Sequence, residues 1–93
     1  MEEFRERLDR IDAQIRELFL SRMRVCKEIG YYKKETGLEI ENKAREEEIL
    51  AKVCSGIDPE AAYYVKDLFE ELIALSKDVQ RAIVEDGEEG PEF

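Results

Sequence analysis

An apolar side chain recurs every three or four positions between Glu2 and Lys34, and no proline interrupts this stretch. This spacing is the period of an α-helix, and at ~1.5 Å per residue it predicts a helix roughly 50 Å long. A helix of that length needs another helix along its side. We therefore predict an all-α fold and expect a dimer, because a chain of 93 residues has too little of its own surface to cover such a helix.

Two glycines mark special points of this first helix. Gly30 lies inside it and costs about 1 kcal/mol relative to alanine. Gly37 follows Thr36 and is suited to the left-handed backbone conformation at a helix C-terminus. The helix is therefore expected to end at Gly37, with an extended connection after it.

Two further helices are predicted downstream. Asn42 is a suitable N-cap for a short helix over residues 43–53. Asp58-Pro59 is a cap followed by a proline at the first helical position, and the third helix runs from there to Val84. We expect residues 1–85 to form one helical domain. Residues 86–93 form an acidic tail that we predict to be disordered.

The overall charge restricts the class of partner. A formal net charge of -9 argues against general binding of nucleic acid and of anionic membranes, and no apolar run is long enough to span a bilayer. No secretory signal is visible at the start, so we expect a cytoplasmic protein. Cys26 and Cys54 are expected to be reduced thiols in apolar surroundings.

The chain has no histidine, which restricts the chemistry further. It excludes a Ser-His or Cys-His nucleophile, and no set of cysteines has zinc-ligand spacing. We expect neither a metal nor a cofactor. Catalysis would have to rely on Arg, Lys, Glu and hydrogen bonds, which favours reactions that need electrostatic stabilisation over reactions that need a proton shuttle.

Polar side chains interrupt the apolar positions of these helices, where they cost stability unless they are paired or bind something. Arg22 and Lys33 are 11 positions apart, so they lie within roughly 20° of each other around the helix. Ser76 and Gln80 are four apart and share a face of the third helix. Cations, a hydroxyl and an amide arranged in this way suit a small, oxygen-rich dianion.

Three more residues belong to this pattern. Arg5 is 17 positions before Arg22 and lies roughly 100° away around the helix, so we expect it to point toward a site in a partner subunit. Arg45-Glu46 adds a cation and a carboxylate near the start of the second helix. Taken singly, these residues also fit a solvated face or a register-setting polar position.

Taken together, these positions resemble the all-helical class of chorismate mutases, over about residues 4 to 84. Each motif is short, but their joint order and spacing make the resemblance specific. The matching stretches are Arg5-Glu6-Arg7-Leu8-Asp9-Arg10-Ile11-Asp12, Leu18-Phe19-Leu20-Ser21-Arg22, Ile29-Gly30-Tyr31-Tyr32-Lys33, Asn42-Lys43-Ala44-Arg45-Glu46, Leu68-Phe69 and Ser76-Lys77-Asp78-Val79-Gln80.

The resemblance implies an intertwined helical homodimer of long, short and long helices, with two active sites that each use both chains. Arg22, and Arg5 from the other subunit, would bind the two carboxylates of chorismate. Ser76 would assist near a carboxylate. Lys33 and Gln80 would hydrogen-bond the ether oxygen of the C–O bond that breaks.

Three further roles come from the same resemblance. Glu46 would accept a hydrogen bond from the ring hydroxyl, and Arg45 would help to organise the pocket. The family often has Asp where this chain has Asn42, and the family contact there can involve the backbone amide. Asn42 would therefore bind substrate through its N–H group.

The implied reaction is the rearrangement of chorismate to prephenate in phenylalanine and tyrosine biosynthesis. It is pericyclic and needs no proton transfer, which agrees with a chain that lacks histidine. Two alternatives stay open on the sequence. An isochorismate-pyruvate lyase would have a similar fold and cationic pocket, and a non-enzymatic helical dimerisation module would have the fold without turnover.

Overall fold

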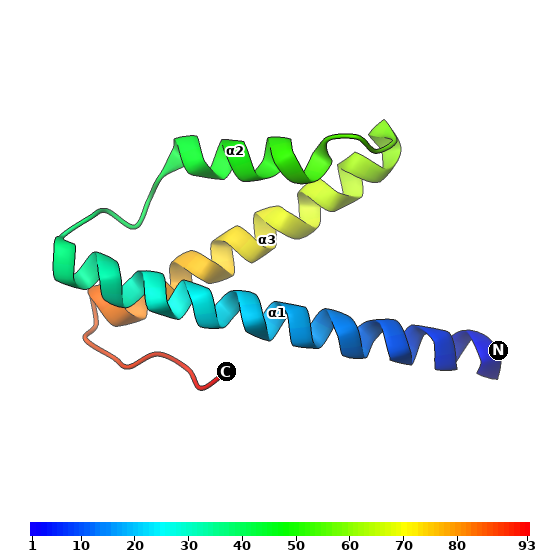
Figure 1. Cartoon of the computed structure of the whole chain (residues 1–93), viewed down its shortest axis with the longest axis horizontal. Coiled ribbons are helices and arrows are strands. Elements are labelled where there is room, and N and C mark those ends of the chain that lie inside the picture. Colours follow the sequence, from blue (N-terminus) through cyan, green and yellow to red (C-terminus); the bar gives the residue numbers. More distant parts are fainter.

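The computed structural model describes all 93 residues and consists of three α-helices with no strand (Figure 1). The helices are α1 (Glu2–Thr36), α2 (Lys43–Cys54) and α3 (Pro59–Val84). This confirms the predicted all-α class. The third helix has its predicted bounds, and the second extends one residue beyond them. The first ends at Thr36, directly before Gly37 as predicted and two residues after the periodic stretch that ends at Lys34.

The helix ends follow the local chemistry of the sequence. Gly37 has a φ of 73°, and its N–H donates to the carbonyl of Lys33, so it ends α1 in the left-handed conformation. The Asn42 side chain accepts a 3.0 Å hydrogen bond from the backbone N–H of Arg45 at the start of α2. Asp58 caps α3 in the same way, and Pro59 occupies its first turn.

The core lies where the C-terminal half of α1 crosses the C-terminal half of α3. Met23 packs there against Val79 and Ile83, and Ile83 has no exposed surface. Gly30 is at this crossing: a Cβ atom there would lie 3.0 Å from Ile83 Cδ1 and 3.4 Å from Gln80 Cα. The glycine that weakens the helix in isolation therefore lets the backbones of α1 and α3 approach closely beside Gln80.

Helix α2 is held more loosely than the other two. Its backbone comes close to α3 and not to α1, and Figure 1 shows α2 and α3 diverging from the turn that joins them. None of its twelve residues is buried. The position of α2 therefore depends on a few contacts with α3 and on the connection from α1.

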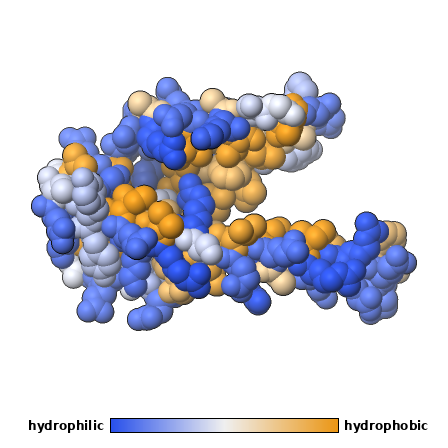
Figure 2. Space-filling view, in the orientation of Figure 1, coloured by the Kyte–Doolittle hydropathy of each residue, from blue (hydrophilic) through white to orange (hydrophobic).

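Much of the apolar surface stays uncovered in a single chain. Only eight of the 93 residues are buried, and the radius of gyration is 15.8 Å, against about 12 Å for a compact domain of this length. Figure 2 shows apolar surface on the N-terminal half of α1, on the side that faces α2 and α3 across a wide opening. The exposed residues of this half include Phe4, Leu8, Ile11, Ile15 and Leu18.

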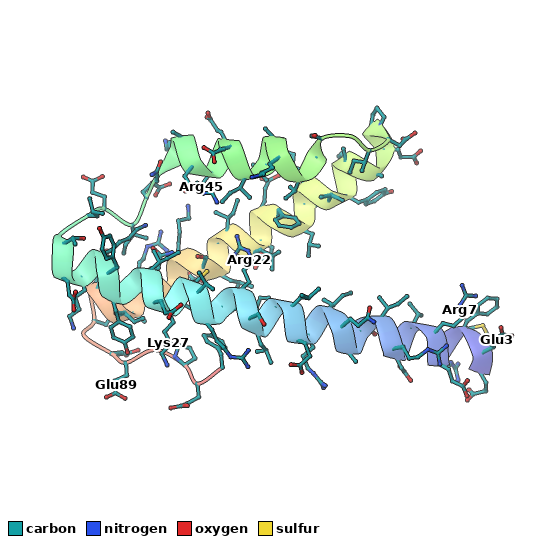
Figure 3. The ribbon with its side chains drawn as sticks, in the orientation of Figure 1. Glu3, Arg7, Arg22, Lys27, Arg45 and Glu89 are labelled. Atoms are coloured by element: carbon teal, nitrogen blue, oxygen red, sulfur yellow. The ribbon has the colours of Figure 1, made fainter.

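The acidic tail forms no helix or strand, and its predicted disorder stays a prediction. In the structure it returns along α1, where Lys27 Nζ donates a 2.9 Å hydrogen bond to the carbonyl of Pro91. Tyr31 donates likewise to the carbonyl of Glu89, and Figure 3 shows Lys27 and Glu89 on this side of α1. The tail lies away from the cavity described next.

Candidate functional site

A cavity of about 480 Å³ lies between the C-terminal half of α1, the first turns of α2 and the C-terminal half of α3. This is the size of a site for a small metabolite. It takes polar side chains from all three helices and has apolar walls between them. The residues that line it are Arg22, Val25, Cys26, Ile29, Lys33, Asn42, Arg45, Glu46, Ile49, Ile73, Lys77 and Gln80.

Two of the cations have no carboxylate partner. The Arg22 guanidinium donates only to the carbonyl of Leu72, at 3.4 Å, and to Cys26 Sγ, at 3.8 Å. Lys33 Nζ donates to the carbonyl of Ile40 at 3.0 Å. Both side chains are half-buried, and neither belongs to an ion pair. Partly buried charges of this kind cost stability unless an anion binds them.

The other two cations of the cavity are paired. Arg45 forms an exposed ion pair with Glu48, three residues further along α2. Lys77 Nζ lies 3.3 Å from Glu46 Oε2 and 3.3 Å from Glu41 Oε1. Figure 3 shows Arg22 and Arg45 coming from α1 and α2 to the space beside α3.

A short chain of hydrogen bonds runs beneath the cavity, where α1 and α3 meet. Ser76 Oγ donates to Cys26 Sγ at 2.9 Å, and Gln80 Nε2 donates to Ser76 Oγ at 3.0 Å. Gln80 is 5% exposed, and its Oε1 has no hydrogen-bond partner. A buried amide with one unpaired atom is the kind of group that a bound ligand satisfies.

The charge of the cavity is opposite to that of the whole chain. Four cations and one carboxylate line it, whereas the chain carries a net charge of -9. A local positive field attracts anions of low molecular weight while the surrounding acidic surface repels polyanions. No group of carboxylates and thiols is arranged to hold a metal ion, and no stretch of α1, α2 or α3 has the length and apolarity that a bilayer span requires.

Six of the eight residues predicted from the sequence line this cavity, and two do not. Ser76 lies beneath it, in the hydrogen-bonded chain with Gln80. Arg5 is near the far end of α1, about 26 Å from Arg22 along the axis, and pairs with Glu2. The labelled Arg7 marks this end of the helix in Figure 3.

Lys77 is the charged residue of the cavity that sequence reasoning missed. Its position three residues before Gln80 places both on neighbouring parts of one helix face, and this was the signal available. Its partners Glu41 and Glu46 are 36 and 31 positions away, so the sequence alone did not bring them together.

The fold and the cavity define a class: small all-α proteins with a cationic site for a small anion between their helices. Comparison with known families identifies the family within this class, because the family model for chorismate mutase type II matches residues 4–81. The chain therefore belongs to the chorismate mutase type II family. No curated protein and no solved structure matches the chain significantly.

Proposed function

We propose that this protein is a chorismate mutase, which rearranges chorismate to prephenate. One observation carries the proposal beyond family membership. Arg22 and Lys33 are half-buried and lack carboxylate partners in a cavity that also contains Glu46 and the amide of Gln80. Unpaired cations beside a neutral donor suit a dianion whose ether oxygen gains negative charge as its C–O bond breaks.

Binding comes first in the proposed mechanism. Arg22 holds one carboxylate of chorismate through its guanidinium, which matches the geometry of a carboxylate better than a lysine does. Arg45 helps to organise this side of the pocket. The backbone N–H of Asn42 contacts the substrate, because its side chain already caps α2. These contacts restrict the flexible substrate to conformers in which the reacting carbons are close.

The chemical step depends on Lys33 and Gln80. Lys33 supplies a fixed positive charge, and Gln80 supplies a neutral hydrogen-bond donor, both directed at the ether oxygen. They bind this oxygen more tightly in the transition state than in the substrate, and this difference in binding accelerates the reaction. Glu46 accepts the hydrogen bond of the ring hydroxyl and so fixes the ring in the cavity.

The hydrogen-bonded chain beneath the cavity is suited to orient Gln80. A half-turn of the amide about its last bond exchanges Oε1 and Nε2, which have nearly the same shape. Ser76 O–H then donates to Oε1, the thiol of Cys26 donates to Ser76 Oγ, and Nε2 takes the place of the unpaired atom. The amide thereby presents a donor to the ligand, with every group of the chain satisfied.

The proposal includes an intertwined homodimer. The exposed apolar face of α1, with Leu18 72% exposed, needs a partner of similar apolarity. A second copy of the chain would fill the wide opening between α1 and the α2–α3 pair in Figure 2. This arrangement would bring Arg5 of one subunit to the second carboxylate in the site of the other, a position that it does not reach within its own chain.

The first experiment is to follow chorismate consumption by ultraviolet absorbance and to identify the product by NMR. We expect prephenate. Lys33→Ala should reduce turnover by about 10²–10³-fold, as the loss of an oxyanion donor does. Lys34→Ala removes the same charge from the neighbouring exposed residue and should leave the rate unchanged. An active Lys33→Ala variant would refute the ether-oxygen contact.

Two other results would redirect the assignment. Formation of pyruvate from isochorismate, with chorismate left intact, would identify an isochorismate-pyruvate lyase. If the protein catalysed neither reaction at any concentration tested, it would be a non-enzymatic helical module. Chorismate and isochorismate should therefore be tested in parallel with the same preparation.

Sharing of the active sites is tested by mixing two inactive chains. Arg5→Ala and Arg22→Ala should each be inactive alone. Unfolding and refolding them together at equal amounts yields heterodimers in half of the molecules, with one intact site of two, so about a quarter of the normal activity should return. No recovery in a mixture that contains heterodimers would refute the shared site.

A further inference from the structure

The cavity contains a cation with no role in the mechanism proposed above. Lys77 lies on α3 three residues before Gln80, and its side chain is 19% exposed. Its ammonium group is 3.3 Å from Glu46 Oε2 and 3.4 Å from Glu46 Oε1, so it faces both oxygens of that carboxylate. It also contacts Glu41 Oε1 at 3.3 Å.

These contacts join the parts of the site that are otherwise least connected. Glu46 belongs to α2, which has no buried residue and whose backbone does not come close to α1. Glu41 belongs to the connection that leads from α1 into α2. The ammonium group of Lys77 therefore ties the start of α2 and the connection before it to α3, beside Gln80.

We propose that Lys77 is a positioning residue of this site, which holds the Glu46 carboxylate in a fixed place relative to Gln80 by bridging it to Glu41. The inference rests on the proposed function, since it concerns how the contact to the ring hydroxyl is set relative to the contact to the ether oxygen. Both contacts are made to one small substrate, so a displaced α2 would misalign them.

The same bridge reduces an electrostatic conflict. Glu46 is 25% exposed and faces a cavity that we propose to bind a dianion. An uncompensated carboxylate there would repel that ligand, and the ammonium group of Lys77, 3.3 Å away, offsets part of this repulsion. Glu41 is 51% exposed and completes the bridge on the outer side.

The ionisation of Lys77 supports this role. Partial burial lowers the pKa of its amine, but the hydrogen bonds and charges of Glu41 and Glu46 more than offset this effect. The resulting pKa is raised above the ordinary value of 10.5. Lys77 therefore keeps its charge, and the bridge persists, throughout the neutral and mildly alkaline range.

The test is a double-mutant cycle on kcat/KM for chorismate. Lys77→Met should lower kcat/KM about tenfold, and Lys77→Arg, which keeps the charge, should restore most of it. In a Glu46→Gln background, Lys77→Met should lower kcat/KM by less than about threefold, because the carboxylate on which Lys77 acts is already absent. Lys66→Met, an exposed lysine of α3, is the control for the same change in net charge.

Each other result would overturn the inference. If Lys77→Met behaved like Lys66→Met, the bridge would have no role in the reaction. If it cost the same factor with and without Glu46, Lys77 would act on the substrate directly. If circular dichroism shows that Lys77→Met does not fold, Lys77→Gln replaces it in the same double-mutant cycle. If the unsubstituted protein itself did not turn over chorismate, the proposed function would be refuted, and the inference with it.

Discussion

Replacement of Gln80 by methionine should make the protein more stable and nearly inactive. Methionine has a similar length and no polar atom that needs a partner. Gln80 is 5% exposed, its Nε2 makes one hydrogen bond to Ser76, and its Oε1 makes none. The amide therefore contributes little to folding and leaves one polar atom free for a ligand.

The expected size of each effect follows from these contacts. The unpaired buried oxygen costs about 1–3 kcal/mol, whereas the single bond to Ser76 contributes about 0.5–1.5 kcal/mol net. Ser76 keeps Cys26 as a partner. Gln80→Met should thus raise the free energy of unfolding by about 1 kcal/mol, or Tm by about 4–8 °C. Loss of one donor at the ether oxygen should lower kcat about 10²–10³-fold.

Thermal unfolding at one fixed protein concentration and steady-state turnover of chorismate measure the two effects on the same samples. Gln80→Glu is the companion variant, since its carboxyl group has the same shape but donates only when protonated. Its rate should fall as pH rises. The reasoning is refuted if Gln80→Met unfolds at a lower temperature, or if it keeps turnover within about threefold of the unsubstituted protein.

Four other predictions concern the same site. The value of kcat should change less than about threefold between pH 6 and 9 in buffers of constant ionic strength. The reason is that Gln80 is neutral and that Lys77 keeps its charge until pH rises through its raised pKa. A collapse of kcat between pH 6 and 8 would contradict this. From neutral pH up to the unfolded pKa of Lys77, the charge of this lysine should contribute its full stabilisation of the fold, and the contribution should be lost in chemical denaturation as pH rises through the raised folded value. KM should rise severalfold between about 0.05 and 0.5 M NaCl with little change in kcat, because salt screens the cationic cavity; a KM independent of salt would argue against binding of a dianion. Asn42→Ala should lower the free energy of unfolding by about 1 kcal/mol in chemical denaturation, whereas Asn42→Asp should leave it nearly unchanged; equal losses would show that the side chain does not act as a cap.

The helices were predictable because their signals are local. The 3.6-residue period of α1, the glycine at its end and the capping residues Asn42 and Asp58 each act within a turn of their own position. Predicted and observed bounds agree within two residues for this reason. Gly30 is the instructive exception: local propensity marks it as a weak point, and only the crossing of α3 explains its presence.

The candidate site was predictable in part. The polar residues Arg22, Lys33 and Gln80 interrupt apolar stripes, and the resemblance to chorismate mutases gave them an order and a set of roles. Lys77 carried only the weaker signal of its spacing from Gln80, because a lysine on a helix is unremarkable until its partners are known. Its pairing with Glu46 depends on how α2 lies against α3, which no local rule specifies.

The sequence by itself determined three helices, their caps and an amphipathic surface too large for one chain, since these depend on neighbours a few residues apart. The tertiary structure decided which charges are free. It paired Lys77 with two carboxylates, left Arg22 and Lys33 without any, and enclosed one unpaired amide atom of Gln80 between α1 and α3. The physical reason is that burial and ion pairing arise between segments far apart in the chain, and only their packing sets the cost of each unpaired group.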